Sequence, residues 1–221
     1  LRDGVAFVAD GRNGLIAYDV AERTASTVLG QVGDLGVATA VVLWFDEGLG
    51  RLYAFVAAGP SGIAVVDVTD PTAMTLVWIV EPRATLGSGG STPLYGRVHD
   101  TAIDGDRVWF SHAPGGVLLY AADELVRTAA PLPLASFRLQ DEPGFEDAIG
   151  VPRGLDLSRA GGMTTLLVAY DEAGLAWVDW TKARIPRLQR LLPTAGSARD
   201  VVTADGRVYV ADLEGGLAAF E

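Results

Sequence analysis

The 221-residue sequence contains no cysteine, and only two of its residues are histidine. The absence of cysteine excludes disulfides, thiolate zinc sites and cysteine nucleophiles, although it does not indicate a cellular compartment. Lysine is almost absent too: Lys182 is the only one among the 17 basic residues. Positive charge therefore comes from arginine, whose planar guanidinium group suits carboxylates and planar partners.

The chain also has little positive charge and no long hydrophobic run. Acidic residues outnumber basic ones by 28 to 17, which gives a formal net charge of −11. Such a chain repels phosphate, so we expect no nucleic acid partner. The longest apolar run, near residues 37–45, is about half of the roughly 18 residues that a membrane helix requires, so we expect no membrane insertion in this segment.

Common cofactor and catalytic motifs are missing as well. The sequence has no Gly-x-Ser-x-Gly elbow and no phosphate-binding loop with its lysine. We therefore predict no cofactor. Hydrophobic residues make up 49% of the chain and charged residues 20%, a composition that excludes global disorder and supplies one sizeable core.

What the sequence does contain is an internal repeat. An apolar alternating run, a short polar interval ending in glycine and a second apolar run recur five times. The runs are rich in β-branched and aromatic residues, and glycine supplies the positive φ that a tight turn requires, so each copy predicts a β-hairpin. The glycines of the motif are Gly14, Gly62, Gly116, Gly174 and Gly216.

Each predicted hairpin has further short apolar runs beside it. Asp104 and Gly105 form one of the turn signals that precede a hairpin, and Asp205 and Gly206 form another. Each unit therefore predicts four antiparallel strands, which we name A to D in chain order. Units of this kind, repeated roughly every 50 residues, predict an all-β propeller of four-stranded antiparallel blades. A sandwich or a plain meander is the alternative, but those folds do not repeat their own sequence.

Residues 62–71 and 208–217 resemble the LVIVD repeat family of bacterial and archaeal surface proteins. The resemblance covers essentially the whole chain at one motif per unit, and YVTN-type propellers are its near neighbours. The third unit departs from the pattern, because Ala121 stands where an acidic residue closes the motif in other units. The resemblance implies a β-propeller in an extracytoplasmic location, which means secreted, periplasmic or at the cell surface. It implies no catalytic motif.

The units predict a single propeller domain over residues 1–221, with repeats at approximately 1–35, 36–97, 98–150, 151–197 and 198–221. When the first repeat is aligned with the last, Gly4 corresponds to Gly206. We therefore expect an incomplete first blade without its inner strand and an incomplete last blade without its outer strand. These strands do not complement each other in one blade, which predicts part of a larger propeller or an incompletely closed five-blade form.

The loops indicate where a ligand would bind. In a meander, the connection from strand D to the next strand A lies at the same end as the B–C turn. The two longest connections, residues 81–97 and 140–153, are both of this kind. Strand A is innermost, so its first residues surround the mouth of the central channel. The predicted ligand or partner face comprises Tyr95, Arg97, His99, Asp100, His112, Phe145, Arg153, Arg199 and Asp200.

Several of these residues have two interpretations. Arg153 and Arg199 suit bidentate hydrogen bonds to carboxylate or peptide groups, while Tyr95 and Phe145 offer aromatic anchors. Arg199 could instead be structural, because a two-residue turn after its strand would pair it with Asp212 in a cross-strand ion pair.

The two histidines raise the question of a metal. His99 and His112 fall at the same end of one unit, but no third ligand is identified. A one-residue change of register would also place them on opposite faces. We therefore expect polar rim residues and no metal. The acidic residues between 141 and 147 could supply paired carboxylates for glycoside chemistry, but a solvated acidic loop is the simpler interpretation.

These observations predict a non-catalytic extracytoplasmic binding or scaffold module that uses the channel-mouth face. Its partner, whether a protein, a peptide or a small molecule, is not identified by the sequence. The alternative is a propeller enzyme at the same mouth, either a hydrolase or lyase that uses His99 with Asp100 or a metal-dependent enzyme, since propellers host many chemistries.

Overall fold

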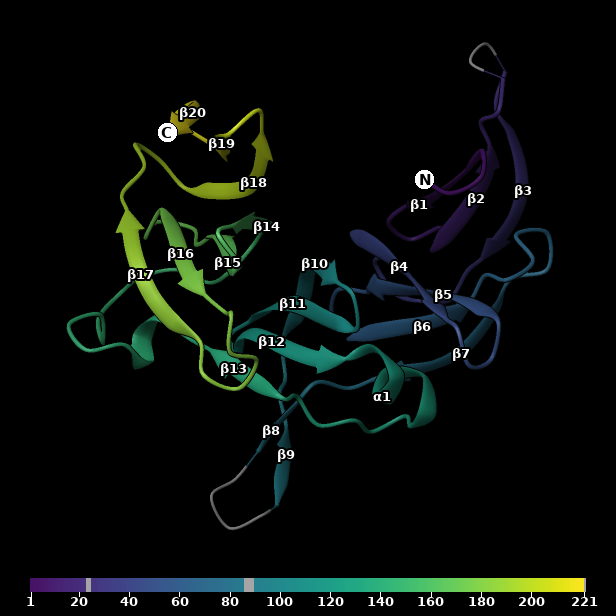
Figure 1. The fold of residues 1–221 in the computed structure, drawn as a ribbon, viewed down its shortest axis with the longest axis horizontal. Helices are drawn as coiled ribbons and strands as arrows, with labels where there is room; N and C mark the ends of the chain where they lie inside the picture. Colours follow the sequence, from purple (N-terminus) through teal and green to yellow (C-terminus); the bar gives the residue numbers. More distant parts are fainter. Residues whose placement is uncertain (23–24, 86–89, 221) are drawn as a thin grey trace.

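The computed structural model describes residues 1–22, 25–85 and 90–220. Over these residues the chain forms β-strands with one short α-helix and one 3-10 helix. Five antiparallel sheets follow one another along an arc, with the two termini at its ends (Figure 1). The all-β prediction and its five central hairpins are confirmed.

The strands of each sheet run in chain order. The first sheet contains β1 (Val5–Ala9), β2 (Leu15–Asp19) and β3 (Thr27–Val32). The second contains β4 (Ala40–Asp46), β5 (Arg51–Ala57), β6 (Ile63–Asp67) and β7 (Thr75–Val80). The third contains β10 (Arg97–Asp104), β11 (Arg107–Ala113), β12 (Gly116–Ala121) and β13 (Ala135–Phe137). The fourth contains β14 (Leu155–Ala160), β15 (Met163–Ala169), β16 (Leu175–Asp179) and β17 (Arg187–Leu192). The fifth contains β18 (Ala198–Ala204), β19 (Arg207–Asp212) and β20 (Gly216–Phe220).

Three short elements lie between these strands. A separate hairpin of β8 (Arg83–Thr85) and β9 (Ser91–Pro93) projects from the connection between the second and third sheets (Figure 1). Helix α1 (Ala122–Arg127) follows β12, and the 3-10 helix η1 (Leu139–Asp141) follows β13. Within the described ranges, no helix has the length and hydrophobicity that a membrane span requires.

The first strand of each sheet lies on the inside of the arc. Strands β1, β4, β10, β14 and β18 contact one another in succession, whereas β3, β7, β13 and β17 lie on the outside (Figure 1). A buried hydrophobic cluster fills each space between successive sheets. In one of them Trp109 and Trp180 are fully buried with their ring centroids 6.1 Å apart. The sheets are therefore held to one another by apolar packing face to face.

The repeated glycine meets two local requirements at once. Gly62 has a φ of 102°, and a Cβ atom added to it would lie 2.3 Å from the carbonyl oxygen of Val80 in strand D. Gly174 has a φ of 93° and the same contact, at 2.2 Å, with Leu192. Any other residue would both be strained and push the outer strand away, which explains why glycine recurs in the motif.

The closing acidic residue of the motif ends strand C. The carboxylates of Asp19, Asp67 and Asp179 each accept a hydrogen bond from the backbone N–H two residues later, at 2.9 to 3.0 Å. Such a bond builds a turn. Ala121 cannot form it, and here the chain continues into α1 instead. The departure from the repeat in the third unit thus coincides with a local change of structure.

Candidate functional site

The inner strands of the last three sheets begin with a β-bulge. The register shifts by one residue at His99 in β10 and at Arg199 in β18. Before β14, Arg153 and Gly154 together oppose Ala169, which accepts from the first and donates to the second. A bulge interrupts the alternation of side chains along a strand. Consecutive residues at these three places can therefore face the same side.

Two of these places, His99 and Arg199, come directly after a β-bridge that joins two successive sheets. The residue before the bulge pairs with the B–C turn of the preceding sheet, as Ala198 does with Asp171. The turn residue has a positive φ, 44° at Asp171 and 59° at Gly59. The B–C turn of one sheet thus positions the start of the next inner strand. The other two bridges are Gly11 with Ala38 and Gly59 with Val98.

The starts of the inner strands line an open cavity of about 330 Å³, which we call the inner-strand cavity. Five residues of the predicted face line it together, although they come from three different sheets. The Thr39 hydroxyl donates to the carbonyl of His99 at 2.7 Å and closes one side. The lining residues are Thr39, His99, Asp100, Arg153, Gly154, Arg199 and Asp200.

Asp171 lies behind the cavity and was not predicted as a site residue. It is 5% exposed, and its Oδ1 atom is 2.9 Å from Nε of Arg153 and 3.1 Å from Nη1 of Arg199. One buried carboxylate therefore orients both guanidinium groups. The available signal was an acidic residue at a turn position where the first two units have glycine, Gly11 and Gly59.

The alternative interpretation of Arg199, in which it pairs with Asp212, is wrong. The turn at Asp205 and Gly206 forms with φ values of 51° and 76°. The bulge, however, places Ala198 opposite Asp212, and Arg199 pairs with Asp171 instead. The Asp212 carboxylate accepts hydrogen bonds from the backbone of Gly196 at 2.7 Å and from the hydroxyl of Thr194 at 2.9 Å.

His99 is in contact with one of the arginines. Its Nε2 atom lies 2.9 Å from Nη1 of Arg153. Burial and the neighbouring charge of Arg153 lower the pKa of His99 to about 4, and Arg97 contributes in the same direction. The imidazole is therefore neutral at pH 7 and accepts a hydrogen bond from Arg153 through Nε2.

Asp100 has a pKa shifted toward neutral pH. Its carboxylate accepts hydrogen bonds from the backbone of Leu155 at 2.7 Å and of Thr101 at 2.8 Å. Burial outweighs these bonds, and with the charges of Asp200 and Asp156 it raises the pKa of Asp100 to about 6. The carboxylate therefore changes charge under mildly acidic conditions.

Gly154 allows two inner strands to approach closely. A Cβ atom added to Gly154 would lie 2.5 Å from Oδ1 of Asp200 and 2.6 Å from its Cα atom. Asp200 is exposed, and its Oδ1 atom accepts a hydrogen bond from the backbone of Val201 at 2.9 Å. A side chain at position 154 would displace Asp200 from the cavity wall.

The structure places Tyr95 and His112 apart from this cavity. Both line a second recess of about 160 Å³ beside the turn at Gly59. Tyr95 is 81% exposed, whereas His112 is buried and accepts a hydrogen bond from the backbone of Gly115 at 3.0 Å. Within the described part of the chain, no group of three or more His, Asp or Glu side chains is arranged to hold a metal ion.

The remaining predicted residues differ in position. Arg97 starts β10 and is exposed, close enough for its charge to act on His99. Phe145 is partly buried and packs against the hydrophobic cluster between the third and fourth sheets. Phe145 therefore serves the core instead of offering an exposed anchor. Part of the long connection before β10, residues 86–89, lies outside the described residues.

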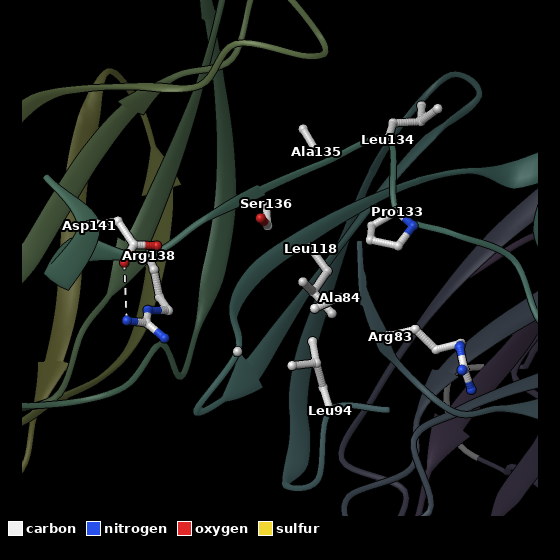
Figure 2. A pocket seen from close by; sticks show the side chains of 11 residues that line it. Arg83, Ala84, Leu94, Leu118, Pro133, Leu134, Ala135, Ser136, Arg138 and Asp141 are labelled. Atoms are coloured by element: carbon white, nitrogen blue, oxygen red, sulfur yellow. Dashed lines mark ion pairs between the residues drawn. The ribbon is translucent and has the colours of Figure 1, made fainter. Parts of the chain in front are cut away.

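Another cavity, of about 220 Å³, lies between the β8–β9 hairpin and β13 (Figure 2). Arg83 and Arg138 lie on opposite sides of its apolar residues, among them Leu118 (Figure 2). Both guanidinium groups have partners: Arg138 lies 3.1 Å from Asp141, and Nε of Arg83 donates to the hydroxyl of Ser91 at 2.9 Å. The inner-strand cavity combines more ionisable groups, and we take it as the candidate site.

Successive antiparallel sheets with their inner strands around a polar cavity define a repeat protein of the β-propeller type. The LVIVD repeat model matches residues 2–34, 52–81 and 195–219, which fall on the first, second and fifth sheets. The chain thus carries LVIVD repeats at three places, consistent with an LVIVD-repeat family. No curated protein matches the sequence.

Two computationally designed proteins are similar in structure. Ika8 has a TM-score of 0.63 at 12% identity, over 100% of this chain and 56% of that one. Ika4 has a TM-score of 0.51 at 15% identity, over 86% of this chain and 98% of that one. The chain therefore spans 56% of the length of Ika8. At these identities the likeness concerns the fold alone.

Proposed function

We propose that the chain is a non-catalytic binding module outside the cytoplasm, and that its inner-strand cavity is the channel mouth where a carboxylate group of the ligand is bound. The pair of guanidinium groups held by the buried carboxylate of Asp171 carries this proposal. Nε of Arg199 is buried and has no hydrogen-bond partner within the described residues. The Arg199 side chain as a whole is 38% exposed, and a ligand carboxylate would bind to its accessible part.

The arrangement favours binding because the arginines are already oriented. An arginine side chain loses rotamer freedom when it binds a ligand, and this loss weakens affinity. Asp171 fixes Arg153 and Arg199 in advance, so less of that freedom remains to be lost. Guanidinium groups also match the planar geometry of a carboxylate, which favours this ligand group over a spherical anion.

Titration of the chain with small carboxylates, followed by NMR or calorimetry, tests the proposal. We expect binding to weaken at least tenfold in Arg199→Gln and in Arg153→Gln, the size expected for the loss of a charge-assisted hydrogen bond. Arg12→Gln is the matched control, because Arg12 is an exposed arginine in the B–C turn of the first sheet. Equal affinities in all three variants would refute carboxylate binding at this cavity.

A propeller enzyme at the same cavity is the second candidate. It is favoured by the raised pKa of Asp100, which shares the cavity with Asp200, since catalytic acids have pKa values near the working pH. Turnover of small ester substrates that disappears in Asp100→Asn, with ligand binding retained, would support catalysis. Turnover that survives in Asp100→Asn would exclude Asp100 as its acid or base.

A further inference from the structure

The inner-strand cavity presents opposite charges on adjacent residues. Arg199 and Asp200 are consecutive in the sequence, and both line the cavity. In a regular strand, consecutive side chains point to opposite faces. The bulge between Ala198 and Asp200 interrupts this alternation, so the guanidinium and the carboxylate face the same space.

The carboxylate of Asp200 is available to a ligand. Asp200 is exposed and takes part in no ion pair among the described residues. Both arginines of the cavity, in contrast, are paired with Asp171. Gly154 keeps the neighbouring inner strand close, because a side chain there would displace Asp200. The wall of the cavity thus holds two carboxylates without a cationic partner among the described residues, Asp100 and Asp200. Asp100 is partly buried and already accepts backbone hydrogen bonds from Leu155 and Thr101, so Asp200 is the exposed one.

The balance of charge does not suit a simple anion. The positive charges of Arg153 and Arg199 are opposed by the buried charge of Asp171, by the exposed charge of Asp200 and, above its pKa of about 6, by the charge of Asp100. A ligand with only a carboxylate would approach the arginines but be repelled by Asp200. A ligand that also carries a positive group would pair with both sides.

We infer that the ligand of the inner-strand cavity is a zwitterion whose ammonium group lies next to its carboxylate, as in a free α-amino acid. This inference rests on the proposed function and adds the second recognised group. The carboxylate binds at Arg199 and Arg153, and the ammonium group donates to Asp200. Adjacent charges on the ligand match adjacent charges on residues 199 and 200.

The lining specifies the kind of ammonium group. Quaternary ammonium groups are held in proteins by the faces of Trp, Tyr and Phe, and none of these is among the described residues that line the cavity. A primary ammonium group has N–H donors for the Asp200 carboxylate. The volume of about 330 Å³ lies at the lower end of the range for ligand sites, so the cavity suits a small molecule.

Three related probes test the inference on the full chain at pH 7: alanine, N-acetylalanine and alaninamide. Alanine carries both charges, N-acetylalanine carries only the carboxylate, and alaninamide carries only the ammonium group. We expect NMR titration to show alanine binding at least tenfold more tightly than either of the others. In Asp200→Asn, alanine should bind no better than N-acetylalanine does. Asp205→Asn, an exposed substitution in the β18–β19 turn, is the matched control and should bind like the unaltered chain.

The outcomes separate this inference from the proposed function. If N-acetylalanine binds as tightly as alanine, or if Asp200→Asn leaves the preference for alanine unchanged, the ammonium site is refuted and carboxylate binding stands. If alaninamide binds as tightly as alanine, or if none of the three probes binds, both proposals fail. Because Asp200 is exposed, Asp200→Asn is expected to fold, and circular dichroism verifies this.

Discussion

Asp171 offers the sharpest test of how the site is held together. Asp171→Asn removes the charge that Arg153 and Arg199 share but keeps the size of the side chain. Asparagine also tolerates the positive φ of 44° found here, so the backbone adds no strain. The substitution therefore acts mainly on the two ion pairs, because the other hydrogen bonds that Asp171 accepts, from the Val151 backbone and the Ser197 hydroxyl, are long at 3.4 Å.

The magnitude follows from burial. A hydrogen bond to a charged group contributes about 1.5–3 kcal/mol where water is excluded. The Asp171 side chain is 7% exposed, but those of Arg153 and Arg199 are 27% and 38% exposed, so solvent screens both pairs. We expect the free energy of unfolding to fall by about 2–3 kcal/mol in total. For a chain of this size that corresponds to a melting temperature lower by roughly 4–12 °C.

Chemical denaturation at pH 7 measures this loss. Asp205→Asn is the matched control, since Asp205 also has a positive φ, 51°, but is exposed and forms no ion pair within the described residues. It should change stability by no more than about 0.5 kcal/mol. If Asp171→Asn unfolds at the same denaturant concentration as Asp205→Asn, the buried carboxylate does not hold the arginines and the reasoning fails.

Three further predictions concern the turn, the pH dependence and the core. Gly174→Ala should destabilise the chain by roughly 3 kcal/mol or more, because position 174 combines a positive φ with a 2.2 Å contact. Gly206 has a positive φ but open space around it, so Gly206→Ala should cost only about 1–2 kcal/mol in thermal denaturation. Equal losses of stability in the two variants would contradict the role of the contact. The raised pKa of Asp100 lowers stability as the pH rises from about 4 to 6, whereas the lowered pKa of His99 raises stability over about pH 4 to 6.5. Relative to the unaltered chain, urea denaturation should therefore show stability rising more steeply with pH in Asp100→Asn and less steeply in His99→Gln; the opposite signs would refute these assignments. Phe145→Ala should lower the free energy of unfolding by about 2 kcal/mol and leave carboxylate affinity unchanged, and a loss of affinity without a loss of stability would restore Phe145 as an anchor.

The fold could be predicted from the sequence because its main requirement is local. Each B–C turn needs a glycine for its positive φ, and in the first four units also for its contact with the outer strand, so the same residue recurs in every unit. The position of His99, Arg153 and Arg199 near one another could also be predicted, since it follows from the order of strands in a meander.

The contacts inside the site could not be predicted, because they depend on single-residue shifts. A bulge at Arg199 leaves the pattern of apolar residues nearly unchanged but exchanges Asp212 for Asp171 as its partner. Phe145 lies in a loop whose burial is decided by packing between two sheets. Neither effect has a signal in local sequence.

The bridges between B–C turns and inner strands have a consequence for how such a protein diversifies. The residue after each bridge occupies an equivalent place, yet it is Thr39 in one unit, His99 in another and Arg199 in a third. The backbone of the neighbouring turn fixes this position, so the side chain there can be exchanged without a change in the structure of the sheet. Duplication of a unit would add one more position of this kind. Ligand recognition could then evolve by substitution at these positions while the hairpins stay constant.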